Sequence, residues 1–225
     1  MISFNRHLLK SNQTGLTNAA VLIAVAALIS SLLGVVRDAL LASHLGLSRS
    51  LDIYYAAFRV PDFFYNIFIY GAITVGFIPV LTAYLKKDKQ SGWDLTSGLC
   101  FCLGGFLVIC GLLATIFAVP LCSHIFPGFN AVELSQTVSM MRVLMIQPIL
   151  LGLSSIYSAV LEVFRLFLAD SLAPILYNVG IILGIIFLLP KYGLMGLAFG
   201  VVLGAIFSLG VRILAMKELG YHWSF

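Results

Sequence analysis

The chain has 225 residues, of which 61% are hydrophobic and 10% are charged, and its formal net charge is +4. Soluble domains carry about 25% charged residues, so this composition excludes an ordinary soluble protein and predicts an all-α integral membrane protein with several spans. No basic run is interleaved with aromatic residues, and we therefore expect no nucleic-acid partner.

Six apolar runs predict transmembrane helices, at about 20 residues per span. The predicted spans are about 16–41, 53–85, 95–119, 132–164, 171–189 and 194–215. The first run is longer than the apolar part of a typical signal peptide, so we expect it to be retained as a helix. The second run would measure about 50 Å as a straight helix, which is too long for one upright span, and we expect it to bend at Pro61 and Pro79.

Basic residues are distributed unequally between the two ends of the predicted bundle. Six spans bring both termini to one end, which collects eight Lys and Arg residues: Arg6, Lys10, Lys86, Lys87, Lys89, Arg165, Arg212 and Lys217. The opposite end collects only Arg49 and Lys191. Cytoplasmic loops of membrane proteins are enriched in Lys and Arg, so we expect both termini in the cytoplasm.

Polar residues follow helical spacing in the first span. Ser30, Gly34 and Arg37 are separated by four and three residues, which places them on one helix face. The planar guanidinium matches phosphate oxygens, so this face predicts either contact with a neighbouring helix or an anionic ligand. Two further alternatives stay open, in which Arg37 reaches to the membrane interface or pairs with Asp52.

The second run repeats this pattern. Arg59, Asp62 and Asn66 have the same three-and-four spacing, and Tyr70 continues it. Arg59 and Asp62 either neutralise one another along the helix or line a site, and we favour the site. Charged residues inside a membrane usually face a partner or a water-filled cavity, so we predict that segment 30–84 forms one wall of a polar cavity.

The later spans carry fewer polar signals. Arg142 lies inside the fourth span, where a structural ion pair with another helix is the alternative to a site. We expect Glu162 and Asp170 to be interfacial and Asn178 to form a hydrogen bond across helices. A ladder of small residues on the last two spans predicts close helix packing: Gly180, Gly184, Gly196, Gly200 and Gly204.

The patterns of common enzyme and metal sites are absent from the sequence. The four histidines are never paired as HExxH, and there is no GxSxG and no phosphate-binding glycine loop. No histidine lies at ligand spacing from the four cysteines, which we interpret as small buried residues: Cys100, Cys102, Cys110 and Cys122. We therefore predict no enzymatic activity, no cofactor and no metal.

Several motifs, in order along nearly the whole chain, resemble the MurJ/MviN family. They are SSLLGVVRDALLASHLG (30–46), D-x-x-x-x-A-F-R-x-P (52–61), I-F-x-x-G-A (67–72), F-I-P-V-L (77–81), P-G-F (127–129) and A-P-I-L-Y-N-V-G-I-I-L-G (173–184). Each motif is weak alone, but together they are specific. The family belongs to the multidrug/oligosaccharidyl-lipid/polysaccharide exporter superfamily.

The resemblance implies a lipid II flippase of peptidoglycan synthesis, in the bacterial inner membrane, with two helical lobes around a cationic cavity and alternating access. This chain matches the first six of about fourteen helices, so we expect one lobe, whose partner is a second transmembrane lobe or another copy of the chain. Arg37 matches a cavity arginine taken to bind the lipid pyrophosphate. The other positions that the resemblance and the spacing assign to substrate are Asp38, Asp52, Arg59, Ser30, Gly34 and Asn66.

The chain departs from the family pattern at several cavity positions. Ser31 replaces an arginine, Tyr65 and Asn66 replace a basic pair, and Tyr70 replaces an acidic residue. These changes predict a cavity that is less cationic than the family norm. Two alternatives therefore stay beside lipid II transport: export of another lipid-linked oligosaccharide or a drug, and a membrane scaffold without transport activity.

Overall fold

The structure is a computed structural model that describes residues 16–46, 48–67 and 76–223. Every regular element within these ranges is a helix, which confirms the all-α prediction. Five helices are long and apolar enough to cross a membrane: Ala20–Leu45, Lys89–Ile116, Ala131–Val163, Phe167–Tyr192 and Leu194–Glu218. The remaining predicted span, about 53–85, includes residues 68–75, which lie outside the described part of the chain.

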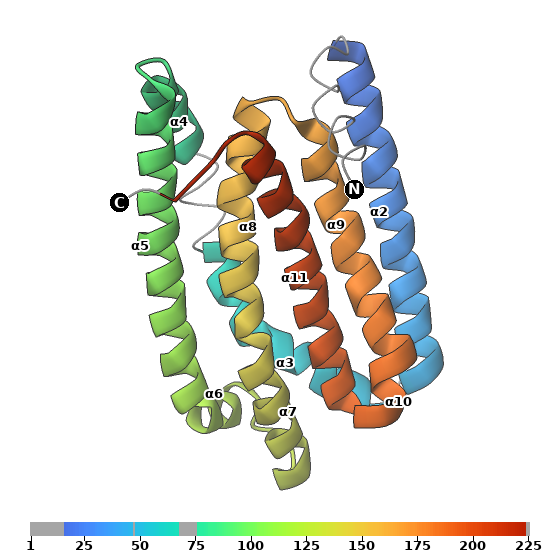
Figure 1. The fold of residues 1–225 in the computed structure, drawn as a ribbon. Helices are drawn as coiled ribbons and strands as arrows, with labels where there is room; N and C mark the ends of the chain where they lie inside the picture. The colour runs from blue at the N-terminus through green and yellow to red at the C-terminus, as the bar shows by residue number, and fades with distance from the viewer. Residues whose placement is uncertain (1–15, 47, 68–75, 224–225) are drawn as a thin grey trace.

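Five long helices stand side by side and form the body of the molecule (Figure 1). In order across the molecule they are α2 (Leu16–Leu45), α9 (Phe167–Leu183), α11 (Leu194–Glu218), α8 (Ile146–Val163) and α5 (Lys89–Ile116). α3 (Arg49–Tyr65) crosses one face of this row obliquely and packs on α7 (Ala131–Leu144) and α8. The oblique course of α3 places its polar residues beside α2, α8 and α9.

The closest helix contact joins α9 to α11 through glycines. A Cβ added to Gly180 would lie 2.3 Å from the Cα of Gly204, and one added to Gly200 would lie 2.6 Å from the Cα of Gly184. Only residues without a side chain allow two backbones to approach this closely, so the predicted packing role of the ladder is confirmed. α9 continues through a π-helical turn, Gly184–Leu188, into α10 (Leu189–Tyr192).

The boundaries of three predicted spans differ from the observed helices. The region predicted as one helix over 132–164 consists of α7 and α8, which meet at Met145, and Pro148 lies in the first turn of α8, where a missing N–H is tolerated. The N-terminal end of α7 is capped by Asn130 and Glu133. A short helix, α6 (Ala118–Ile125), follows α5, and the helical region predicted to end near 189 extends to Tyr192.

The predicted second region is observed only at its ends. Pro61 lies inside α3, which continues to Tyr65, and Pro79 lies in the first turn of α4 (Ile78–Leu85). A proline in a first turn removes no intrahelical hydrogen bond, so Pro79 is compatible with a helix that starts there. The bends predicted at Pro61 and Pro79 stay predictions, because residues 68–75, which connect the two helices, lie outside the described part of the chain.

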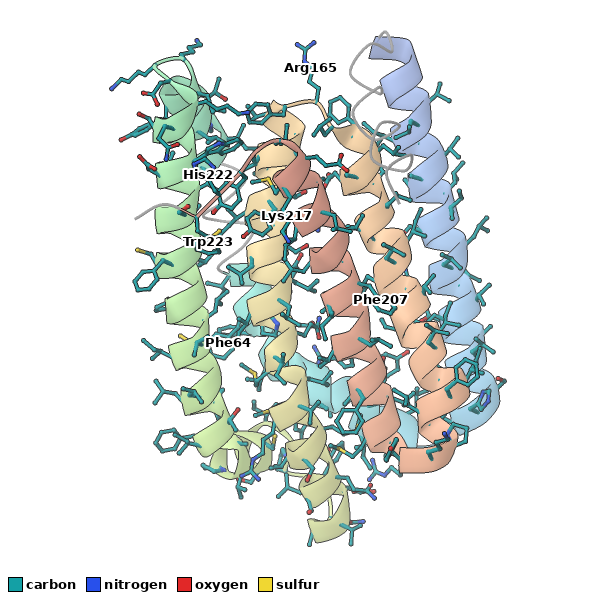
Figure 2. The ribbon with its side chains drawn as sticks, in the orientation of Figure 1. Phe64, Arg165, Phe207, Lys217, His222 and Trp223 are labelled. Carbon is teal, nitrogen blue, oxygen red and sulfur yellow. The ribbon has the colours of Figure 1, made fainter. Side chains whose placement is uncertain are left out.

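Basic residues gather at one end of the bundle. Figure 2 shows Arg165 projecting from the connection between α8 and α9, at the same end as Lys217 of α11. The α4–α5 connection, which carries Lys86 and Lys87, also lies at this end (Figure 1). The charge count also assigned Arg212 to this end, but its side chain lies inside the bundle and is only 13% exposed.

Candidate functional site

Arg37 projects from α2 and lines a cavity. Its Nε donates to Asp38 Oδ1 at 2.9 Å, and its Nη1 donates to Asn178 Oδ1 of α9 at 3.1 Å. The side chain is 28% exposed and lines a cavity of about 520 Å³, which we call the Arg37 cavity. The observed carboxylate partner of Arg37 is Asp38, so the alternative pairing with Asp52 does not occur.

Asn178 of α9 connects this helix to α2. Its Nδ2 donates to the backbone oxygen and to Oγ of Ser30, both at 3.2 Å, while its Oδ1 accepts from Arg37. The predicted hydrogen bond of Asn178 across helices is therefore confirmed. Ser30 and Arg37 both contact α9 on the face that the spacing indicates, whereas a Cβ on Gly34 would meet no atom within 4 Å. Asn178 thus fixes the direction of the guanidinium.

Three helices supply the walls of the Arg37 cavity. The lining residues are Arg37, Asp38 and Leu41 of α2, Tyr54, Tyr55, Phe58, Arg59 and Asp62 of α3, and Tyr177 and Ile181 of α9. Arg59 and Asp62 interact electrostatically but form no ion pair or hydrogen bond with each other, so the neutralisation that we considered along the helix occurs without direct contact. The cavity contains two arginines and two aspartates, and no described residue forms an ion pair with Arg59.

Four of the seven predicted site residues do not line the Arg37 cavity: Ser30, Gly34, Asp52 and Asn66. Asp52, 60% exposed, is in the first turn of α3 and pairs with Arg49 at 3.7 Å; it does not line the Arg37 cavity. Arg49 also pairs with the buried Glu133 at 3.1 Å, which links α3 to α7. Asn66 follows α3 and lines a second cavity. Tyr70, which continues the predicted polar face, lies outside the described residues.

The second cavity, of about 530 Å³, opens beside the first, and we call it the Gln147 cavity. Its lining residues are Asp62, Tyr65 and Asn66 near α3, Gln147, Leu151, Ser155 and Ser158 of α8, Pro174 and Tyr177 of α9, and Ser208 and Arg212 of α11. Asp62 and Tyr177 line both cavities, so the two spaces adjoin.

A partly buried ion pair at the Gln147 cavity was missed from the sequence. Arg212 places Nε and Nη2 each 2.8 Å from Asp170 Oδ1, and its Nη1 donates to Ser154 Oγ at 2.6 Å. Ser158 Oγ donates to the same carboxylate at 2.5 Å. We expected Asp170 at the interface, but it joins α9 to α8 and α11. The four-residue spacing of Ser154 and Ser158 was a signal that one face of α8 is polar.

Arg142 and the four cysteines line neither of these cavities. Arg142 donates from Nε to the backbone oxygen of Thr115, 3.3 Å away near the end of α5, and not to the acidic residue that we considered. A cation is favourable at this helix terminus because the last carbonyls carry partial negative charge. Within the described ranges, the four cysteines are free thiols and no cluster of His, Cys, Asp and Glu could hold a metal ion.

Comparison with known proteins identifies relatives over most of the chain. The model of the family described as lipid II flippase MurJ matches residues 41–225, so the match begins just after Arg37. A probable lipid II flippase MurJ of Aquifex aeolicus is 31% identical over 196 residues, covering 86% of this chain and 39% of that protein. One of Buchnera aphidicola subsp. Acyrthosiphon pisum is 27% identical over 213 residues, covering 90% and 42%.

Lipid II flippase MurJ of Burkholderia cenocepacia is 28% identical over 204 residues, covering 85% of this chain and 38% of that protein. This chain therefore spans about two fifths of the length of these curated relatives. A solved structure, lipid II flippase MurJ in an inward closed conformation, superposes with a TM-score of 0.75 at 23% identity. The superposition covers 91% of this chain and 43% of that one, and it establishes a shared fold.

Proposed function

This chain belongs to the MurJ family of lipid II flippases, and from that premise we propose that it forms one lobe of a transporter for a lipid-linked peptidoglycan precursor. The substrate is lipid II, a sugar precursor joined to undecaprenyl diphosphate. The lobe binds and reorients this substrate without catalysing a reaction on it. Alternating access follows from rocking this lobe against a second transmembrane lobe or a second copy of the chain.

The observation that carries this proposal is a guanidinium held towards an open cavity at membrane depth. Arg37 uses Nε for Asp38 and Nη1 for Asn178, and no described residue accepts a hydrogen bond from its Nη2. Arginine donates a planar fork of hydrogen bonds to phosphate oxygens. Attraction between opposite charges is stronger in a low-dielectric cavity than in water, so this position favours the diphosphate group.

Arg59 supplies a second cation to the same cavity. It projects from α3, while Arg37 projects from α2, so two helices approach one diphosphate from different sides. Asp38 and Asp62 offset these charges and limit the attraction for anions. This balance favours a substrate in which the diphosphate is only one part. The same balance is compatible with a related function, the export of another polyprenyl-linked oligosaccharide through this cavity.

The orientation that we propose places the basic end of the bundle in the cytoplasm. Lys86, Lys87, Arg165 and Lys217 lie at this end, and Arg49 and Lys191 belong to α3 and α10 at the other end (Figure 1). Cytoplasmic loops carry the excess of basic residues in membrane proteins. Both termini are then cytoplasmic in a bacterial inner membrane.

The experiment that tests the function measures lipid II externalised by cells depleted of their own flippase. The chain is expressed alone and together with the C-terminal lobe of a family member. We expect transport with wild type and with Arg142→Ala, and loss of transport with Arg37→Ala. Equal transport by Arg37→Ala and wild type would remove Arg37 from the mechanism. Complementation of strains that lack other oligosaccharide flippases distinguishes the related function.

A further inference from the structure

Gln147 is a buried side chain whose amide oxygen has no hydrogen-bond partner among the described residues. It is 4% exposed and lines the Gln147 cavity. Buried polar atoms are almost always paired, because an unpaired one keeps the full cost of leaving water. An orphaned acceptor on a cavity wall indicates a ligand that donates a hydrogen bond there.

Other acceptor atoms face the same cavity. Ser155 uses its hydrogen to donate to the backbone oxygen of Leu151 at 2.9 Å, and Ser158 uses its hydrogen to donate to Asp170. A hydroxyl that has donated its only hydrogen still offers oxygen lone pairs. The carboxylate of Asp62 adds further acceptor positions on the opposite wall. The cavity is therefore rich in acceptors and suited to a ligand with several O–H or N–H donors.

The charge of this cavity disfavours a phosphate. Among the described lining residues Arg212 is the one cation, and Asp170 neutralises it through contacts at Nε and Nη2. Asp62 contributes an additional negative charge, on which Arg59 of the neighbouring cavity acts only at a distance, since no ion pair joins these two described residues. An anion would be repelled here, whereas the hydroxyl groups of an uncharged sugar would meet the acceptors directly.

We propose that the Gln147 cavity is a glycan subsite, which takes the uncharged polyhydroxyl part of a lipid-linked substrate whose diphosphate lies in the Arg37 cavity. This assignment rests on the proposed transport function. Asp62 and Tyr177 line both cavities, so the two spaces are neighbours separated by no more than these two side chains. The volumes of about 520 and 530 Å³ each lie in the range of small-molecule sites.

The test compares two probes on the full 225-residue chain in lipid nanodiscs. The probes are undecaprenyl diphosphate and lipid II, which differ in the glycan and its peptide. Gln147→Leu removes the acceptor and keeps a similar side-chain volume. We expect it to weaken lipid II binding roughly three- to tenfold, the effect of one neutral hydrogen bond, and to leave undecaprenyl diphosphate binding unchanged.

Two controls make the result specific. Gln136→Leu introduces the same change at an exposed glutamine of α7 outside both cavities, and it should alter the binding of neither probe. Gln147→Leu should not lower the melting temperature, because it removes an unpaired buried acceptor. If it weakens both probes equally, or neither, the glycan subsite is wrong.

Arg37→Ala separates this inference from the function on which it rests. We expect that variant to weaken both probes. If Arg37→Ala changes neither probe while Gln147→Leu still weakens lipid II alone, the diphosphate assignment fails and the glycan subsite stands. If the wild-type chain binds neither probe, the proposed function fails and the subsite fails with it.

Discussion

Replacing Asp170 with Asn tests the energetic role of the ion pair inside the bundle. The substitution leaves Arg212, whose side chain is 13% exposed, without an ion-pair partner among the described residues. Removing one partner of a fully buried pair costs about 3–5 kcal/mol. Asp170 is 30% exposed and the guanidinium keeps its contact with Ser154, so we place the cost at the lower end, about 3 kcal/mol.

The matched control makes the same substitution in an exposed pair. Asp52 lies 3.7 Å from Arg49, both side chains are at least 60% exposed, and Arg49 retains Glu133 as a partner. Exposed pairs contribute about 0–1 kcal/mol, so Asp52→Asn should cost about 0.5 kcal/mol. At about 2–4 °C per kcal/mol for a chain of this size, Tm should fall by about 6–12 °C for Asp170→Asn and about 1–2 °C for Asp52→Asn.

Thermal unfolding of the purified chain in detergent, followed by intrinsic fluorescence, measures both shifts. The double variant Asp170→Asn with Arg212→Gln should recover part of the lost Tm, because it leaves no unpaired buried charge. Equal shifts for the two single variants would refute this reasoning. A double variant less stable than Asp170→Asn alone would also refute it.

Three further predictions concern packing, capping and the direction of the guanidinium. Gly204→Ala should destabilise the chain by about 1–3 kcal/mol in the same unfolding assay, because the added Cβ would lie 2.4 Å from the backbone oxygen of Tyr177. Gly210→Ala is the control: its Cβ would meet no atom within 4 Å, so it should not destabilise the chain. Hydrogen bonds from Ser91 hold the pKa of Asp88 in the folded chain below its usual value. The Asp88 carboxylate therefore stabilises the fold fully above its unfolded-state pKa, about 4. This stabilisation is lost as the pH falls through the lower folded-state pKa. Asp88→Ala should therefore lose less stability than wild type when thermal unfolding is compared at pH 7 and pH 3; equal losses would contradict this. Asn178→Ala should weaken undecaprenyl diphosphate binding by a smaller factor than Arg37→Ala, because it removes the 3.1 Å contact that directs the guanidinium and keeps the guanidinium itself. An effect as large as that of Arg37→Ala would count against a directing role.

Local sequence patterns predicted much of the fold because lipid limits the chain to apolar helices. Composition predicted an all-helical membrane protein, and four-residue spacing predicted the Gly180–Gly204 contact. The face that carries Ser30 and Arg37 was also readable from spacing, since both contact the same residue of α9. Each of these features could be predicted because its signal is a spacing of residues within a single helix.

Features that depend on two distant helices were not predictable in this way. Asp170 and Arg212 are 42 residues apart, and no local pattern indicates that they meet. Each residue alone is typical of a helix end, which is why the sequence places both at the membrane interface. Likewise, the orphaned acceptor of Gln147 is visible only when the surrounding side chains are in place.

The central claim is that Arg37 contacts a diphosphate group, and phosphorus NMR of added undecaprenyl diphosphate tests it most directly. The full chain in lipid nanodiscs should shift and broaden both phosphorus resonances. Arg142→Ala, which removes an exposed arginine that lies outside both cavities, should preserve the shift. Arg37→Ala should abolish it; resonances that shift equally with Arg37→Ala and wild type would contradict the account.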